Sequence, residues 1–118
     1  MSLSPEIRRL LARYCRDKRS RRVARDLGAR WDALRIDNAA TGIPYGEPGA
    51  WALIADSLED MAIAVHELML DKPPGAKAHW WLVPQPGRAS IYIKIQIGAG
   101  GCSVLGRSFH YSEFEEST

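Results

Sequence analysis

The sequence predicts an α+β protein, in which basic N-terminal helices pack on a small, mainly antiparallel C-terminal sheet. Two patterns support this prediction. Apolar residues recur at helical spacing in the first part of the chain, whereas residues 91–97 alternate between isoleucine and polar side chains without interruption. A chain of 118 residues, 46% of them hydrophobic, can bury a core without disulfides, so we expect a single domain over residues 1–118.

The helical part is expected over residues 4–71. Ser4-Pro5-Glu6 has the composition of a helix start, because serine caps, proline suits the first turn and glutamate favours the positive end of the helix dipole. The helix that follows should end near Lys18–Arg19. Its expected buried stripe consists of Ile7, Leu10, Leu11, Tyr14 and Cys15. Its opposite, solvent-facing side then carries Arg8, Arg9, Arg13 and Arg16.

More helix is expected further along. The spacing predicts a second helix over Ser20–Leu27, with Gly28 at its end and one further turn at 31–34. Residues 38–49 are rich in turn formers and predict a loop, anchored by Ile43 and Tyr45. Pro48 can start another helix that carries four large apolar residues, with a candidate break at 57–60. Residues 61–70 then keep helical spacing until the Asp71–Gly75 segment ends the helix.

The sheet is expected over residues 78–111. It should contain a short aromatic strand at 78–83, a turn at 84–88, the alternating strand 91–97, a glycine turn at 98–101 and a returning strand at 102–111. The acidic tail at 113–118 is expected to be frayed. Four isoleucines of the alternating strand should face the core.

The hairpin fixes where polar groups meet. If its turn contains two or four residues, Ile97 pairs with Cys102, and Tyr92 then pairs with Arg107. The polar face gathers Tyr92, Lys94, Gln96 and Arg107, with Lys72, Lys77 and His79 at its rim. Such a face can bind phosphates and transfer protons, although the same residue types are ordinary occupants of the solvent face of a sheet. His110 falls on the isoleucine side unless Gly106 marks a bulge that reverses the alternation.

The charge is divided unevenly along the chain. Residues 1–30 hold ten basic and three acidic side chains, a formal charge of +7, while the remainder holds six basic and eleven acidic ones, a charge of −5. This asymmetry is typical of a protein with a polyanionic or an acidic protein partner. The arginines of the first helix are therefore candidates for phosphate contacts, and a merely solvated helix face is the equally simple alternative.

Several classes of protein are not indicated. Cys15 and Cys102 lie far apart and no Cys-x-x-Cys motif is present, so two reduced, buried thiols are expected. The three histidines show no ligand spacing, so we expect no metal and no cofactor. The N-terminus lacks the apolar segment of a signal peptide and no run approaches the length of a membrane span, which favours the cytoplasm and no membrane partner.

The C-terminal half resembles a known family. Ile91-Tyr92-Ile93-Lys94-Ile95, the glycine turn, and Val104-Leu105-Gly106-Arg107-Ser108-Phe109-His110 are similar to the closing hairpin of the MqsR family, which are RelE-like toxins of type II toxin–antitoxin pairs. Upstream, Ala24-Arg25-Asp26-Leu27-Gly28, an apolar helix and Trp80 follow that family's order of elements.

The resemblance implies a metal-independent endoribonuclease that acts on mRNA and is neutralised by an antitoxin protein. Tyr92 matches the family's strand tyrosine, and His110 replaces the lysine that follows its Ser-Phe pair. Lys72 and Lys77 are candidates for the family's helix lysine. In the implied reaction Tyr92 or His110 transfers protons, Lys94 and Arg107 stabilise the developing charge, and the basic helices hold the RNA.

Two other functions remain open from the sequence. One is a non-enzymatic interaction module, of phage or genomic-island origin, that binds nucleic acid or an acidic protein through its basic helices. The other is a DNA-binding regulator, because residues 21–28 resemble the middle of a helix-turn-helix. A regulator would require a compact tri-helical head, whereas the nuclease would arrest growth when its expression is induced.

Overall fold

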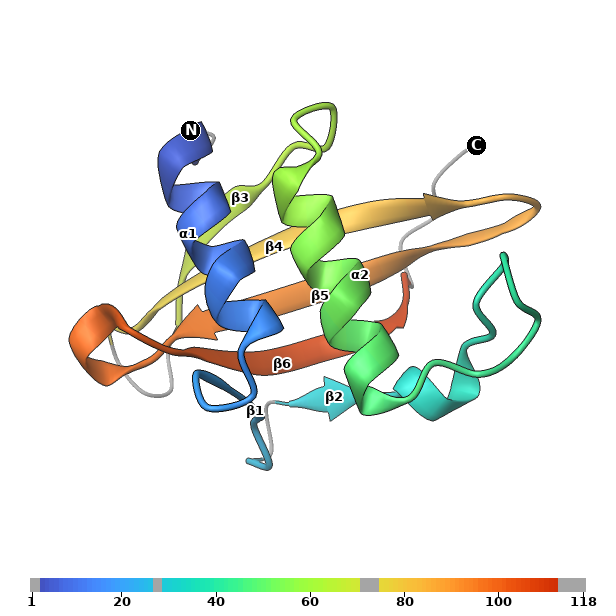
Figure 1. Cartoon of the computed structure of the whole chain (residues 1–118), viewed down its shortest axis with the longest axis horizontal. Coiled ribbons are helices and arrows are strands. Elements are labelled where there is room, and N and C mark those ends of the chain that lie inside the picture. The colour runs from blue at the N-terminus through green and yellow to red at the C-terminus, as the bar shows by residue number, and fades with distance from the viewer. Residues whose placement is uncertain (1–2, 27–28, 71–74, 113–118) are drawn as a thin grey trace.

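Two helices pack on one face of a six-stranded, mixed and mostly antiparallel sheet (Figure 1), as the α+β prediction requires. The structure, a computed structural model, describes residues 3–26, 29–70 and 75–112. Its elements are α1 (Pro5–Arg16), β1 (Arg21–Val23), β2 (Arg30–Trp31), the 3-10 turn η1 (Ala33–Arg35), α2 (Glu47–Glu59), β3 (His66–Met69), β4 (Lys77–Gln85), β5 (Arg88–Ile97), the 3-10 turn η2 (Ala99–Gly101) and β6 (Val104–Tyr111).

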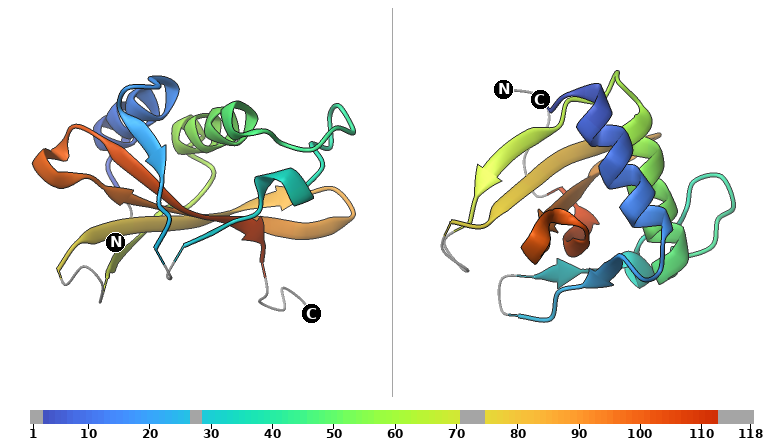
Figure 2. Two further views of the ribbon diagram at one scale, coloured as in Figure 1. Left: turned by 90° about the horizontal axis from the view of Figure 1, so that it is seen from below. Right: turned by 60° about the vertical axis from the view of Figure 1, so that its left-hand side comes forward.

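The sheet is built on a C-terminal meander. Strands β4, β5 and β6 run antiparallel to one another, β3 adds antiparallel to β4, and the strand order is β1-β6-β5-β4-β3. The short strands β1 and β2 both pair with β6 and run parallel to it. Both helices lie on the same side of this sheet (Figure 2), so the other side carries no helix from residues 3–26, 29–70 and 75–112.

Helix α1 begins as predicted but buries a different face. The side chain of Ser4 accepts a hydrogen bond from the amide of Ile7, and the helix ends at Arg16. Its buried residues are Arg8, Leu11, Ala12 and Cys15, while Ile7 and Leu10 are 44% and 39% exposed. The predicted stripe was therefore wrong in part, because the contact with α2 rotates the helix toward Arg8 and away from Ile7.

The second helix predicted over Ser20–Leu27 was wrong. Arg21–Val23 forms β1, which covers the outer edge of β6 in parallel register, with Arg22 opposite Leu105. Tertiary pairing outweighs local helix propensity here, because β6 would otherwise leave its backbone groups unpaired. Since this segment is a strand, the tri-helical head of a DNA-binding regulator is absent from the described part of the chain. Leu27 and Gly28 lie outside the described residues.

Helix α2 confirms the predicted start at Pro48, but the helix predicted over residues 61–70 was wrong. The chain leaves α2 at Asp60, and His66–Met69 pairs with β4 as an edge strand. Val65 is fully buried, whereas Leu68 and Met69 are 38% and 54% exposed. The helical spacing of these apolar residues therefore does not correspond to one buried face. The expected stop at residues 71–74 lies outside the described residues, as does the tail at 113–118.

The β5–β6 register differs from the predicted one by two residues. The connection runs from Gly98 to Ser103, whose backbone groups are hydrogen-bonded at 2.8 Å, so Ile97 pairs with Val104 instead of Cys102. A bulge then follows Gly106, as its position suggested, and reverses the alternation. Gly106 has no room for a side chain, because a Cβ would lie 2.4 Å from Cζ3 of Trp31. Beyond the bulge, Tyr92 pairs with His110 and not with Arg107.

The core lies between the helices and the sheet. Ile91, Ile93 and Ile95 are fully buried as expected, and they share this layer with Trp51 of α2 and Trp81 of β4. The loop over residues 38–46 is anchored by Tyr45, whose ring packs edge-on against Phe109, whereas Ile43 is 64% exposed and anchors nothing. No helix in the described ranges is long and apolar enough to cross a membrane.

Both cysteines are free thiols. Cys15 is buried as expected, and burial raises the pKa of its thiol to about 12. Cys102 is exposed in the β5–β6 connection, contrary to the prediction, because the longer connection carries it beyond the end of the strand.

Candidate functional site

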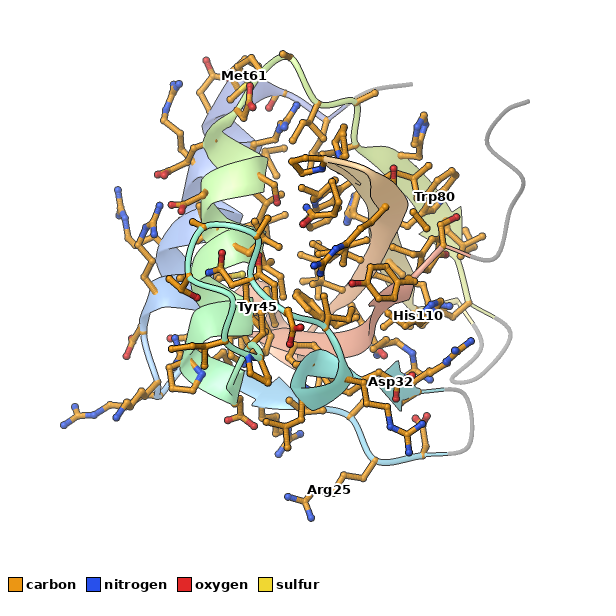
Figure 3. All side chains as sticks on the ribbon, turned by 90° about the vertical axis from the view of Figure 1, so that its right-hand side faces the viewer. Arg25, Asp32, Tyr45, Met61, Trp80 and His110 are labelled. Carbon is orange, nitrogen blue, oxygen red and sulfur yellow. The ribbon has the colours of Figure 1, made fainter. Side chains whose placement is uncertain are left out.

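One face of the sheet is turned away from both helices (Figure 2), and we call it the open face. On β5 its residues are Tyr92, Lys94 and Gln96, which alternate with the buried isoleucines as predicted. Register places their neighbours from the adjacent strands: Leu82 and His110 beside Tyr92, Trp80 and Ser108 beside Lys94, Ala78 and Leu105 beside Gln96. Figure 3 shows Trp80 and His110 directed away from the helix layer.

Four rings stack across four strands of the open face. We call His66, Trp80, Tyr92 and His110 the aromatic row. Successive ring centroids lie 4.4, 5.7 and 5.2 Å apart, and the ring planes are inclined by 29°, 19° and 21°. The row begins at the exposed ring of His66 and ends at His110, which is 9% exposed. Because the rings already stack on one another, a further planar group can stack on the free outer side of His66.

An apolar hollow lies at the His66 end of the row. It is lined by side chains of β3, β4 and the segment before β3, among them Ile63, His66, Trp80, Leu82 and Pro84. Most of the lining is aliphatic or aromatic, with the imidazole of His66 as a polar group at the edge. This combination suits a flat heterocycle that carries hydrogen-bonding groups, such as a nucleobase.

The backbone partner of His110 decides which ring nitrogen carries the proton when the ring is neutral. The ring atom Nδ1 lies 2.8 Å from the carbonyl oxygen of Tyr111. A carbonyl oxygen can only accept, so Nδ1 carries the proton in the neutral ring and Nε2 carries the lone pair. The second nitrogen of His110 is therefore the atom that can accept a proton from a bound molecule.

Tyr92 and Lys94 are half-buried beside this histidine. Burial raises the pKa of the Tyr92 phenol, so the phenol stays protonated at neutral pH and can donate a proton or a hydrogen bond. Burial, and then the positive charge of Arg107, lowers the pKa of Lys94. Arg107 reaches the same face, because Gln96, two residues along β5 from Lys94, accepts a hydrogen bond from its guanidinium.

Arg107 occupies the bulge and is held in place by two partners. Its guanidinium donates from Nη1 to Gln96 Oε1 at 3.0 Å, and from Nη1 and Nη2 to the two carboxylate oxygens of Asp26 at 3.0 and 2.7 Å. The residue is 4% exposed and its Nε has no partner among the described groups. The predicted proximity to Gln96 is therefore observed, but Arg107 does not face Tyr92.

The arginines of α1 do not form the predicted binding surface. Arg8 is buried, and its guanidinium donates to the carbonyl oxygens of Leu58, Ser57 and Asp60 at 2.8, 3.0 and 2.9 Å. It satisfies the C-terminal carbonyls of α2, where a cation also complements the helix dipole, so it is not accessible to a polyanion. Arg16 forms ion pairs with Asp56 and Glu59 of α2. Arg9 and Arg13 stay exposed, but α1 lies on the opposite side of the sheet from the open face.

The two lysines expected at the rim are not found there. Lys77 shares its side of β4 with His79 and Trp81, which is the side covered by the helix layer, and its charge acts on His79. His79 likewise lies on the covered side and is 1% exposed. The strand pairing explains both positions, because Ala78 between them is opposite Gln96 on the open face. Lys72 lies outside the described residues.

Sequence reasoning missed the residues whose role depends on strand pairing. Trp80 enters the aromatic row because β4 pairs with β5. His66 enters it because β3 pairs with β4, and the sequence predicted helix in place of β3. Asp26 reaches Arg107 from a segment that was predicted to be helical. The sequence does contain one signal for the row, because Trp80 directly precedes Trp81 in a strand, and only one of the two can face the core. Within the described residues, no three His, Cys, Asp or Glu side chains gather in a way that could hold a metal ion.

His79 makes the stability of the fold dependent on pH. Neither ring nitrogen forms a hydrogen bond with the described residues, and its nearest charge is Glu67, 3.8 Å from Nε2. Burial lowers the pKa of His79 more than Glu67 raises it, and Lys77 lowers it further. The neutral ring is thus the form that the fold accepts.

We expect the free energy of unfolding to decrease as the pH falls below about 6.5, the ordinary histidine value. Between the unfolded-state pKa and the lower folded-state pKa of His79, the unfolded chain binds a proton that the folded chain does not bind. This difference in proton binding favours unfolding as the pH falls. Urea unfolding at about pH 7.5 and about pH 5.5 measures the difference. His79→Leu should reduce it, and the exposed His66→Gln should leave it unchanged; an equal pH dependence in the wild type and His79→Leu would contradict this assignment.

Comparison of the chain with protein-family models, with curated proteins and with solved structures finds no match. The resemblance of the hairpin to MqsR therefore stays a prediction.

Proposed function

We propose that this protein is a metal-independent endoribonuclease of the toxin–antitoxin type that binds single-stranded RNA on the open face of its sheet. The observation that carries the proposal is the stacked pair of Tyr92 and His110, with Lys94 two residues along β5 from Tyr92 on the same face. The pair combines a proton acceptor at His110 Nε2 with a protonated phenol, and Lys94 supplies the neighbouring positive charge. Arg107 lies further along the face, where it donates to Gln96.

These groups suit cleavage through the RNA 2′-hydroxyl. His110 Nε2 removes the 2′-hydroxyl proton, the 2′-oxygen attacks the adjacent phosphorus, and the bond to the 5′-oxygen breaks to leave a 2′,3′-cyclic phosphate. The Tyr92 phenol protonates the departing 5′-oxygen and becomes a phenolate. The proton that His110 accepted then passes through water to the phenolate and restores the phenol. Lys94 and Arg107 stabilise the negative charge on the non-bridging phosphate oxygens.

The rest of the open face supports single-stranded RNA as the substrate class. Unpaired bases bind proteins by stacking on exposed rings, which is a sequence-tolerant contact. The exposed end of the aromatic row and the hollow beside His66 offer such a contact on the same face as the proposed reacting groups.

The test is cleavage of a synthetic single-stranded RNA by the purified chain in excess EDTA. We expect fragments that end in a 2′,3′-cyclic phosphate, and no cleavage of the same sequence with 2′-O-methyl groups, because that oligonucleotide lacks the nucleophile. Induced expression should arrest growth, and co-expression of an antitoxin encoded by an adjacent gene should restore it. Intact RNA after prolonged incubation, together with normal growth under strong induction, would refute the enzymatic proposal.

A second candidate function is binding without cleavage, to nucleic acid or an acidic protein. It is favoured by the small exposure of His110 and Arg107, 9% and 4%, and by the engagement of Arg107 with Asp26 and Gln96. The two functions are separated by Tyr92→Phe and His110→Ala. A binding module retains its full function in both variants, whereas the nuclease loses cleavage.

A further inference from the structure

Strand β1 and the residues on either side of it place Arg19, Arg22 and Arg25 along a trough at the edge of the sheet. Two adjoining hollows share Arg22 and Leu105, and together they extend along β1 and β6. We call this the arginine trough and define it by the side chains of Arg19, Arg22, Arg25, Gln96, Leu105 and Arg107. Arg22 faces the open side, since it pairs with Leu105, which in turn pairs with Gln96.

The three outer arginines of the trough are exposed, and the charge of Arg19 acts on the carboxylate of Asp17. Within the described ranges, the side chains of Arg19, Arg22 and Arg25 form no hydrogen bond or ion pair. Figure 3 shows Arg25 extending into solvent. Their neighbour Arg21 differs, because its guanidinium donates to the carbonyl oxygen of Cys15 at 2.8 Å and lies over Trp51. Because successive side chains of β1 point to opposite sides, Arg21 packs against the protein and Arg22 stays accessible to a ligand.

The trough ends at the carboxylate of Asp26, which lies where a bound anion would contact Arg107. Arg107 presents two N–H groups to Asp26, in the paired geometry that guanidinium also uses for phosphate. Asp26 is 55% exposed, while Arg107 beneath it is 5% exposed. An anion that arrives along the trough therefore meets Arg107 at the place where the carboxylate lies. Gln96, which lines the trough and accepts a hydrogen bond from Arg107, lies two residues along β5 from Lys94 and so connects the trough to the candidate site.

We infer that the backbone of a single-stranded RNA lies in the arginine trough, and that one of its phosphates displaces the Asp26 carboxylate from Arg107. Arg19, Arg22 and Arg25 contact the preceding phosphates, and the strand then reaches Lys94. The inference rests on the proposed function for the identity of the ligand, but it concerns binding and not cleavage.

The first test is the affinity of the full chain for a fluorescent 2′-O-methyl oligoribonucleotide, which cannot be cleaved, measured by anisotropy over a range of salt concentrations. Arg22→Ala/Arg25→Ala should weaken binding about tenfold or more and reduce the slope of log affinity against log salt by about 1.4, since each phosphate contact on a single strand contributes about 0.7. The matched control is Arg9→Ala/Arg13→Ala, which removes the same charge from α1. An equal loss in both double variants, or no loss in the trough variant, would overturn the inference.

The second test removes the carboxylate. Asp26→Asn should bind the same oligonucleotide about threefold more tightly or better, because the phosphate no longer competes with a negative charge. Glu47→Gln on α2 is the control for the change in net charge, and melting temperatures report whether the variants fold. Unchanged or weaker binding by Asp26→Asn would overturn the displacement step. Because binding is measured without cleavage, a chain that binds as expected but leaves ordinary RNA intact refutes only the nuclease proposal.

Discussion

His110→Ala is expected to slow RNA cleavage by a factor of about 10² to 10⁴, the usual contribution of a positioned proton-transfer group. The reason is the hydrogen bond from Nδ1 to the carbonyl oxygen of Tyr111, which makes Nε2 the proton acceptor. Alanine removes this acceptor and also removes the ring on which Tyr92 stacks at 5.2 Å. The rate of appearance of 2′,3′-cyclic phosphate ends from a synthetic RNA measures the loss.

The control for this prediction is His66→Ala at the other end of the aromatic row. It removes the same residue type from the same face, but far from the proposed reacting groups, so we expect cleavage to stay within a few fold of the wild type at saturating RNA. Circular dichroism and the affinity for the uncleavable oligonucleotide show whether His110→Ala folds and binds. Cleavage by His110→Ala within threefold of the wild type would remove this residue from the mechanism.

Arg8→Ala is expected to lower the free energy of unfolding by about 3 kcal/mol or more. The substitution removes three hydrogen bonds from a charged donor, and such bonds contribute about 1.5–3 kcal/mol each in a typical site. The carbonyl oxygen of Leu58 loses its guanidinium donor, whereas those of Ser57 and Asp60 keep the backbone amides of Asp60 and Ile63. A loss of this size should lower the melting temperature of a chain of this length by roughly 10 °C.

The matched control is Arg9→Ala, one residue further along the same helix. Arg9 is exposed, so its removal should change stability by less than about 0.5 kcal/mol. Arg8→Lys should recover only part of the loss, because one ammonium cannot reproduce the fork that reaches three carbonyls. Equal melting temperatures for Arg8→Ala and Arg9→Ala would show that Arg8 does not stabilise the end of α2.

The parts of the fold that were predictable are those with local signals. The cap at Ser4, the start of α2 at Pro48 and the strand Ile91–Ile97 each depend on a few neighbouring residues, and each is observed. The strand is the clearest case, because isoleucine at every second position identifies the buried face of a strand. Tyr92, Lys94 and Gln96 could be assigned to one face for the same reason.

The errors arose where a distant partner decides the conformation. Arg8 looks solvent-facing from spacing alone, and only the three carbonyls of α2, some fifty residues away, make its burial favourable. Arg21–Val23 is a strand because β6 requires a neighbour. The helical spacing in residues 61–70 was misleading because β3 is an edge strand with exposed apolar side chains, for which burial gives no periodic signal.

The candidate site was predictable in composition but not in arrangement. A connection two residues longer than assumed and the bulge after Gly106 together move His110 opposite Tyr92, and they move Arg107 toward Gln96 and Asp26. The suspected bulge was confirmed, but its position relative to β5 depended on the length of the connection. The arginine trough could not be anticipated, because it requires Arg22 to lie on a strand beside Leu105.

The most direct test of the central claim follows the tryptophan indole signals of the ¹⁵N-labelled full chain during titration with uncleavable single-stranded RNA. Trp80 lies on the open face, whereas Trp51 and Trp81 are completely buried in the core. The Trp80→Phe variant assigns the relevant indole signal. We predict that the Trp80 signal shifts to saturation while those of Trp51 and Trp81 stay in place. A stationary Trp80 signal at saturating RNA, with shifts confined to the backbone of α1, would contradict RNA binding on the open face.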